Sequence, residues 1–113
     1  MKKLSDLLQI ARYGMGNGDN ELSLKLIGNY FKLIIEDNRL PSIIVFYNEG
    51  VKLLKTDSPI SAYLKTIESK GITLMACKTC LDFYGIDRMC AGVKGTMIDI
   101  ITLQSDAKKV INL

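Results

Sequence analysis

The segment SIIVFYNEG, residues 42–50, contains the clearest strand signal in the 113-residue chain. Its first six residues form a short run that is rich in β-branched and aromatic side chains, as in a buried strand. The polar residues and glycine at 48–50 then break the pattern. The sequence therefore predicts a strand over 42–47 that ends in a turn.

A helical pattern precedes this strand. Between residues 20 and 37, apolar side chains recur at three- and four-residue spacing. Asp19 or Asn20 is placed to cap the start of the helix, and Asn38 is able to adopt the left-handed conformation that ends it. The sequence therefore predicts an amphipathic helix over 20–37.

A second helical pattern follows the strand. Ser58 is placed to cap it, Pro59 suits its first turn and Gly71 stops it. The other elements that the pattern predicts are strands at 8–13, 72–76, 89–93 and 109–113, helices at 79–84 and 96–106 with Thr96 as cap, and a short extended or helical piece at 51–54.

Strands and helices that alternate in this way predict parallel pairing with right-handed crossovers. The expected fold is α/β, a three-layer sandwich with about five mainly parallel strands and helices on both faces, in a flavodoxin-like or Rossmann-like layout.

Composition and charge limit the classes of protein to which this chain is expected to belong. Hydrophobic residues make up 48% and charged residues 24%, as in globular proteins, so residues 1–113 are expected to form one domain. No apolar run approaches the ~20 residues of a membrane span. Asp6 interrupts the apolar stretch that a signal peptide needs, so a cytoplasmic location is expected. The net charge is +3 without a basic stripe, so nucleic-acid binding is not expected.

Unusual sequences follow each of the first four predicted strands. In open parallel sheets, ligands bind at the carboxyl ends of the strands. The glycine-rich turn at 14–19 matches no dinucleotide or Walker motif and is interpreted as a tight turn that shapes a pocket wall. The residues expected to gather at this edge with the cysteines are Gly16, Asp19, Asn48, Lys52, Lys78 and Lys94.

Cys77 and Cys80 flank the start of a predicted helix. Unpaired backbone N–H groups and the charge of Lys78 favour a thiolate there. A thiolate supports both persulfide formation and disulfide exchange. The alternative is a packed, inert pair, because cysteine is often buried.

A metal site is less favoured. Cys77, Cys80 and Cys90 supply three thiolates and the chain has no histidine, whereas structural zinc takes four ligands. We therefore expect no metal and no other cofactor. Cys90, in a predicted strand, is expected to lie in the core.

Longer segments support a family resemblance. They are GMGNGDNELSLKLIGNYFKLI (14–34), LPSIIVFYNEGVKLL (40–54), LKTIESKGITLMACKTCLDFYGI (64–86) and GTMIDIITLQSDAKKVINL (95–113). Together they resemble the DsrE/DsrF-like family, and more narrowly the C-terminal domain of YedF-type proteins, which are associated with selenium metabolism and sulfurtransferase-like activity. The most specific parts are G-x-G-D at 16–19, N-x-G-V-K-L at 48–53 and C-x-x-C-L-D at 77–82.

The resemblance implies a site and partners. Sulfur-transferring relatives carry a reactive cysteine after the third strand with a glycine eight positions later, which Cys77 and Gly85 match. Cys77 is then the persulfide carrier and Cys80 its partner or resolving thiol, although Lys78 stands where glycine is frequent. Relatives form trimers or hexamers, and a separate TusA-like carrier is expected because no such domain precedes this one.

The function expected from the resemblance is sulfur relay, in sulfur or selenium trafficking. Two alternatives remain: a thiol–disulfide redox protein, and a non-catalytic oligomeric binding subunit of the same fold.

Overall fold

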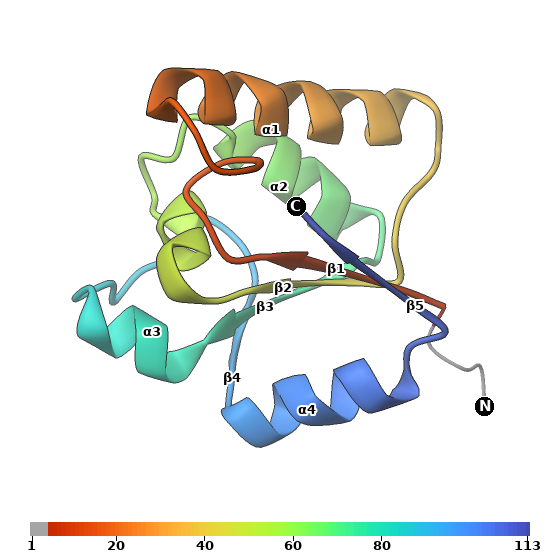
Figure 1. Cartoon of the computed structure of the whole chain (residues 1–113), viewed down its shortest axis with the longest axis vertical. Coiled ribbons are helices and arrows are strands. Elements are labelled where there is room, and N and C mark those ends of the chain that lie inside the picture. The colour runs from red at the N-terminus through yellow and green to blue at the C-terminus, as the bar shows by residue number, and fades with distance from the viewer. Residues whose placement is uncertain (1–4) are drawn as a thin grey trace.

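The computed structural model describes residues 5–113, so the basic start of the chain at 1–4 lies outside the described part. Five strands form one sheet in which each pairing is parallel, in the order β4-β3-β2-β1-β5 (Figure 1). The layout of strands differs from the 2-1-3-4-5 order of flavodoxin. The strands are β1 (Asp6–Ile10), β2 (Ile43–Phe46), β3 (Thr73–Cys77), β4 (Val93–Gly95) and β5 (Lys109–Asn112).

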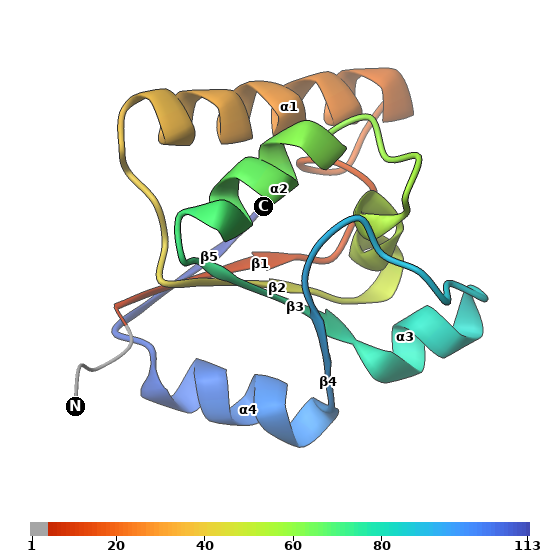
Figure 2. The same ribbon diagram turned by 180° about the vertical axis from the view of Figure 1, so that it is seen from behind.

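Helices cover both faces of the sheet, which confirms the predicted three-layer sandwich. Helices α1 (Asn20–Glu36) and α2 (Ser61–Ser69) lie on one face, and α4 (Met97–Asp106) lies on the other (Figures 1 and 2). The chain steps from β1 to β2 to β3 in one direction and from β4 to β5 in the opposite direction. Right-handed crossovers therefore place α1 and α2 together and α4 opposite them.

Two shorter elements lie at the carboxyl ends of the strands. The 3₁₀ helix η1 (Asn48–Leu54) follows β2, and α3 (Lys78–Phe83) follows β3 without a connecting loop. They lie beyond the same edge of the sheet, on the left in Figure 1. Because β2 and β3 are neighbours, η1 and α3 pack against each other.

The core has two parts, one on each face of the sheet. The larger lies under α1 and α2 and includes Phe31 and Phe46, both without exposed surface. The smaller lies on the other face and combines Leu7, Val45 and Cys77 with Ile100 of α4. Cys77 therefore belongs to the packed layer between the sheet and α4.

The predicted helix ends are largely confirmed. Asp19 caps α1 by accepting a hydrogen bond from the Leu22 amide at 3.1 Å. Asn38 has a φ of 53° after that helix. Thr96 and Asp99 form a reciprocal capping box at the start of α4. Local side-chain chemistry thus sets where these two helices begin.

Four elements differ from the predicted boundaries by two residues or more. The helix η1 begins at Asn48, where the sequence predicts a turn before a piece at 51–54. The first strand ends at Ile10, because residues 11–17 turn away. Helix α2 begins at Ser61, since the Ser58 hydroxyl accepts a hydrogen bond from the Ile60 amide at 3.3 Å and caps the preceding turn instead. The fourth strand is Val93–Gly95 rather than 89–93. Cys90 lies in the predicted strand but outside the sheet, and its amide donates a hydrogen bond to the carbonyl of Leu54 at 2.7 Å.

Within residues 5–113, no helix combines the length and apolar content needed to cross a membrane.

Candidate functional site

The carboxyl ends of β2 and β3 bring a thiol and a polar turn together. Asn48 is the first residue of η1 and Cys80 lies in α3, 32 positions later. With Tyr47, Thr79, Phe83, Tyr84 and Met97, they line an open cavity of about 310 Å³. We refer to it as the thiol cavity.

Cys80 is held by the backbone of Asn48. The Asn48 amide N–H donates a hydrogen bond to Sγ of Cys80 at 3.1 Å. Asn48 is in the left-handed region with a φ of 51°, which asparagine tolerates better than most residues. The Tyr84 hydroxyl donates to Oδ1 of Asn48 at 3.3 Å and supports this arrangement.

The surroundings of Cys80 raise the pKa of its thiol. Burial is the main cause, because it disfavours the charged form, and the neighbouring Cys77 thiol raises the pKa further. The Asn48 amide acts in the opposite sense, because its N–H stabilises the thiolate. The site therefore favours a protonated thiol at rest and offers a donor for the anion once it forms.

Cys77 lies behind Cys80, at the end of β3. It is the N-cap residue of α3 and only 1% exposed. Both cysteines pack on the core cluster between the sheet and α4, and both are free thiols. The pair thus consists of one thiol that lines the cavity and one thiol that is shielded from solvent.

Two of the lysines predicted for the site form ion pairs with acidic side chains. Lys78 pairs with Asp82 at 2.9 Å on the exposed side of α3, so its charge is not directed to the thiols alone. Lys52 pairs with Glu49 at 3.3 Å and lies 4.5 Å from the centre of the Tyr84 ring. Lys52 therefore borders the thiol cavity through Tyr84.

Three of the residues expected at the site do not line the thiol cavity. Gly16 lines a separate small polar hollow with Arg12 and Glu49. Asp19 is occupied as the cap of α1. Lys94 lies within β4, exposed and in register with Ala76, rather than in the loop after the strand. The structure brings together Cys77, Cys80 and Asn48, with Lys52 at the border.

The aromatic wall of the cavity was missed by sequence reasoning. Tyr84 lies four positions after Cys80, which is the spacing that places two residues on one face of a helix, so a local signal existed. Met97 reaches the cavity from the start of α4. Nothing in the local sequence marks Met97, because its place depends on how the sheet folds.

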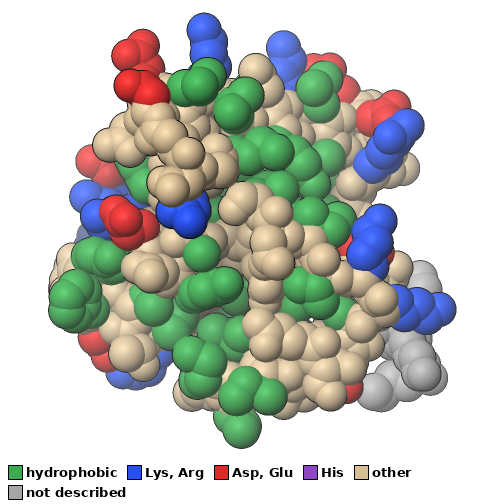
Figure 3. All heavy atoms as spheres, in the orientation of Figure 1, with side chains coloured by type: hydrophobic (Ala, Val, Ile, Leu, Met, Phe, Trp, Pro, Cys, Tyr) green, Lys and Arg blue, Asp and Glu red, His purple; other side chains and the backbone are tan. Residues whose placement is uncertain are grey.

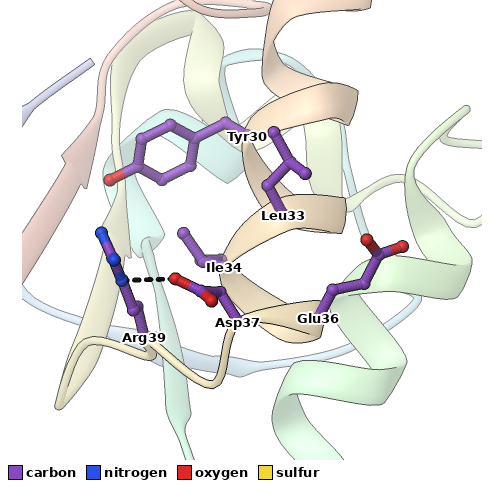
Figure 4. A pocket seen from close by; sticks show the side chains of 6 residues that line it. All are labelled: Tyr30, Leu33, Ile34, Glu36, Asp37 and Arg39. Carbon is purple, nitrogen blue, oxygen red and sulfur yellow. Dashed lines mark ion pairs between the residues drawn. The ribbon is translucent and has the colours of Figure 1, made fainter.

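A larger hollow of about 500 Å³ lies at the end of α1 (Figure 4). Tyr30, Leu33 and Ile34 form its apolar side, and an ion pair between Asp37 and Arg39 closes one edge. None of the described residues that line it is a cysteine. Of these two hollows, the smaller thiol cavity is the one that a cysteine lines.

Cys90 does not line the thiol cavity, and the described residues form no cluster of metal ligands there. Within residues 5–113, no three histidine, cysteine, aspartate or glutamate side chains lie close enough together to hold a metal ion. Cys90 packs against the larger core cluster, where burial raises the pKa of its thiol. The pair of thiols at the thiol cavity is thus Cys77 and Cys80.

Comparisons with known proteins agree with this fold. The sequence model of the DsrE/DsrF-like family matches residues 2–113. The structure of the ychN protein from E. coli is similar over 97% of this chain and 100% of its own, with a TM-score of 0.71 and 22% identity.

Two proteins described as of unknown function are also similar. MTH1491 from Methanobacterium thermoautotrophicum has a TM-score of 0.64 at 20% identity, over 94% of this chain and 98% of its own. BT1422 from Bacteroides thetaiotaomicron has a TM-score of 0.68 at 15% identity, over 96% and 94%. The sequence matches no curated protein.

Proposed function

The chain belongs to the DsrE/DsrF-like family, and from that premise we propose that it is a sulfur-relay protein that carries sulfur as a cysteine persulfide. The observation that carries the proposal is the position of Cys80, whose thiol lines an open cavity and accepts a hydrogen bond from the Asn48 amide. The shielded thiol of Cys77 lies next to it. The cytoplasm, where thiols stay reduced, is the compartment we propose for this chemistry.

We assign the carrier role to Cys80, although the family spacing favours Cys77. Cys77 is 1% exposed, so a donor protein has no access to its sulfur. The Cys80 thiolate attacks the outer sulfur of a donor persulfide, and the donor leaves as its own thiolate. The Asn48 amide holds the negative charge on Sγ before attack.

Partners would meet the protein beside this cavity. Exposed apolar side chains lie on α3, β4 and α4, and Figure 3 shows hydrophobic side chains gathered on its lower left. We refer to these exposed side chains as the apolar surface. We propose that a second copy of the chain covers it in a trimer or hexamer, because large exposed apolar patches mark association sites. A donor or acceptor such as a TusA-like carrier then approaches Cys80. The apolar surface comprises Phe83, Val93, Met97, Ile98 and Ile101.

Mass spectrometry after incubation with a persulfide donor tests the function. We expect a gain of about 32 Da, one sulfur atom, on Cys80. Cys80→Ser should abolish this gain, while Cys90→Ser should retain it and serves as the matched control. A folded wild-type protein that gains no sulfur under any condition would exclude the relay.

The adjacent thiols also favour a second candidate, a thiol–disulfide redox protein. In that case a Cys77–Cys80 disulfide would form and open reversibly with a defined potential. Equilibration in glutathione buffers measures that potential. Reversible cycling without any sulfur uptake would favour this candidate over the relay.

A further inference from the structure

Cys77 and Cys80 are three positions apart, a spacing that brings side chains into contact at the start of a helix. Cys77 is the N-cap of α3 and Cys80 is its third residue. The same spacing joins Thr96 and Asp99 at the start of α4, where Oγ1 donates to Oδ2 at 3.0 Å. Side chains at these two positions meet because the chain turns back on itself there.

Independent features place the thiols together. Both pack on the small core cluster beneath α4. Cys77 also lies close enough to Cys80 to contribute to the raised pKa of the Cys80 thiol. The fold therefore places a second thiol beside Cys80.

The environments of the two thiols differ in one decisive respect. Cys80 lines the thiol cavity, so the outer sulfur of its persulfide has room there. Its inner sulfur, Sγ, stays against the Asn48 amide and beside the buried Cys77. An incoming acceptor reaches the outer sulfur, whereas Cys77 is placed to reach the inner one.

Building on the proposed relay, we infer that Cys77 limits the lifetime of the persulfide by attacking Sγ of Cys80 and releasing hydrosulfide. The Cys77 thiol gives up its proton and its sulfur forms a bond to Sγ. The bond between the two persulfide sulfurs breaks, and the outer sulfur leaves with the electron pair and takes up a proton. In this step the Cys77 sulfur is oxidised, Sγ of Cys80 keeps the oxidation level that it had in the persulfide, and the transferred sulfur is reduced to sulfide.

This step sets up a competition for one persulfide. A docked acceptor takes the outer sulfur and regenerates the Cys80 thiol, so the relay succeeds. Without an acceptor, Cys77 ends the relay and leaves a Cys77–Cys80 disulfide, which an external dithiol reductant must open before the next cycle. The burial of Cys77 keeps external thiols and donors away from it, so its partner is Cys80.

A single-turnover experiment with the full-length protein tests this role. The reduced protein is treated with glutathione persulfide and desalted, and its intact mass and free sulfide are then followed in time. In the wild type, the gain of about 32 Da should give way to a loss of about 2 Da from the reduced mass, with one equivalent of sulfide. In Cys77→Ser, the persulfide should last at least about tenfold longer, without the disulfide.

Matched variants separate the possible outcomes. Cys90→Ser should behave as the wild type, and Cys77→Ala keeps the test valid if serine proves unsuitable in the buried position. A wild-type persulfide as stable as that of both Cys77 variants, without sulfide release, overturns the role of Cys77 and leaves the relay intact. Absence of any sulfur gain in the wild type and all three variants overturns the relay itself, and the inference with it.

Discussion

The backbone amide of Asn48 lies 3.1 Å from the thiol sulfur of Cys80, although 32 positions separate the two residues. The contact exists because β2 and β3 are parallel neighbours, so the turns that follow them meet at one edge of the sheet. It also requires the left-handed backbone of Asn48, with a φ of 51°. The thiol environment is therefore set by a backbone conformation as much as by side chains.

Substitutions at Asn48 should show whether its backbone or its side chain controls the reactivity of Cys80. Asn48→Gly adopts a positive φ readily, so it should keep the amide at Cys80 and label with iodoacetamide within about twofold of the wild type. Asn48→Val is strained there and should lose about 1–3 kcal/mol in the free energy of unfolding. It should also label more slowly, because the amide moves away from the thiol. Equal labelling of the two variants would show that the amide has no influence.

The reactivity of Cys80 should depend on pH in a defined direction. Burial raises the pKa of its thiol, so the thiolate fraction should rise only at a pH above that of an ordinary cysteine. In a Cys90→Ser background, the alkylation rate against pH should therefore have its midpoint above that of the unfolded protein. A midpoint below that of the unfolded protein would contradict the burial argument.

Removing Cys77 should shift the same profile. The Cys77 side chain contributes to the raised pKa of Cys80. Cys77→Ala should therefore lower the midpoint and speed the alkylation of Cys80 at neutral pH. The comparison uses the Cys90→Ser background again, with circular dichroism as the check that the variant is folded. An unchanged profile would mean that the two thiols do not interact.

The sequence predicted those elements whose signals are local. Residues 43–46 are apolar and mostly β-branched, as suits the central and buried strand β2, and α1 has its own N-cap in Asp19. Strand β4 has no such signal. Val93 and Lys94 are exposed in a three-residue edge strand, which is defined by pairing with Met75 and Ala76 of β3. Long-range pairing is not visible in a local pattern.

The candidate site likewise has a part that local signals predict and a part that depends on tertiary packing. Asn48 and Cys80 were predictable because both follow strong strand signals, and parallel neighbours present their ends together. The burial of Cys77 was not predictable, because it depends on the packing of α4 against the sheet. Tertiary packing therefore decides which of the two thiols is exposed.

The apolar surface should govern association. Phe83 is 82% exposed and Ile98 is 67% exposed, so replacing either with aspartate should have little effect on the fold of one chain. If this surface joins copies, Phe83→Asp and Ile98→Asp should shift the protein towards monomers in sedimentation velocity. Leu33→Asp, at a 58% exposed position on α1, is the matched control and should not. Unchanged assembly in all three variants would place the interface elsewhere.

The 3₁₀ helix η1 packs closely against the end of β1 at Gly50. A Cβ added at Gly50 would collide with the carbonyl group of Ile10, 2.8 Å from its carbon, whereas one added at Gly18 would meet nothing within 4 Å. Gly50→Ala must therefore displace η1 or β1, and should cost about 1–3 kcal/mol or more in the free energy of unfolding by urea. Gly18→Ala should be close to neutral. Because Asn48 begins η1, Gly50→Ala should also alter the labelling of Cys80, and an unperturbed, equally stable Gly50→Ala protein would contradict the tight seating of η1.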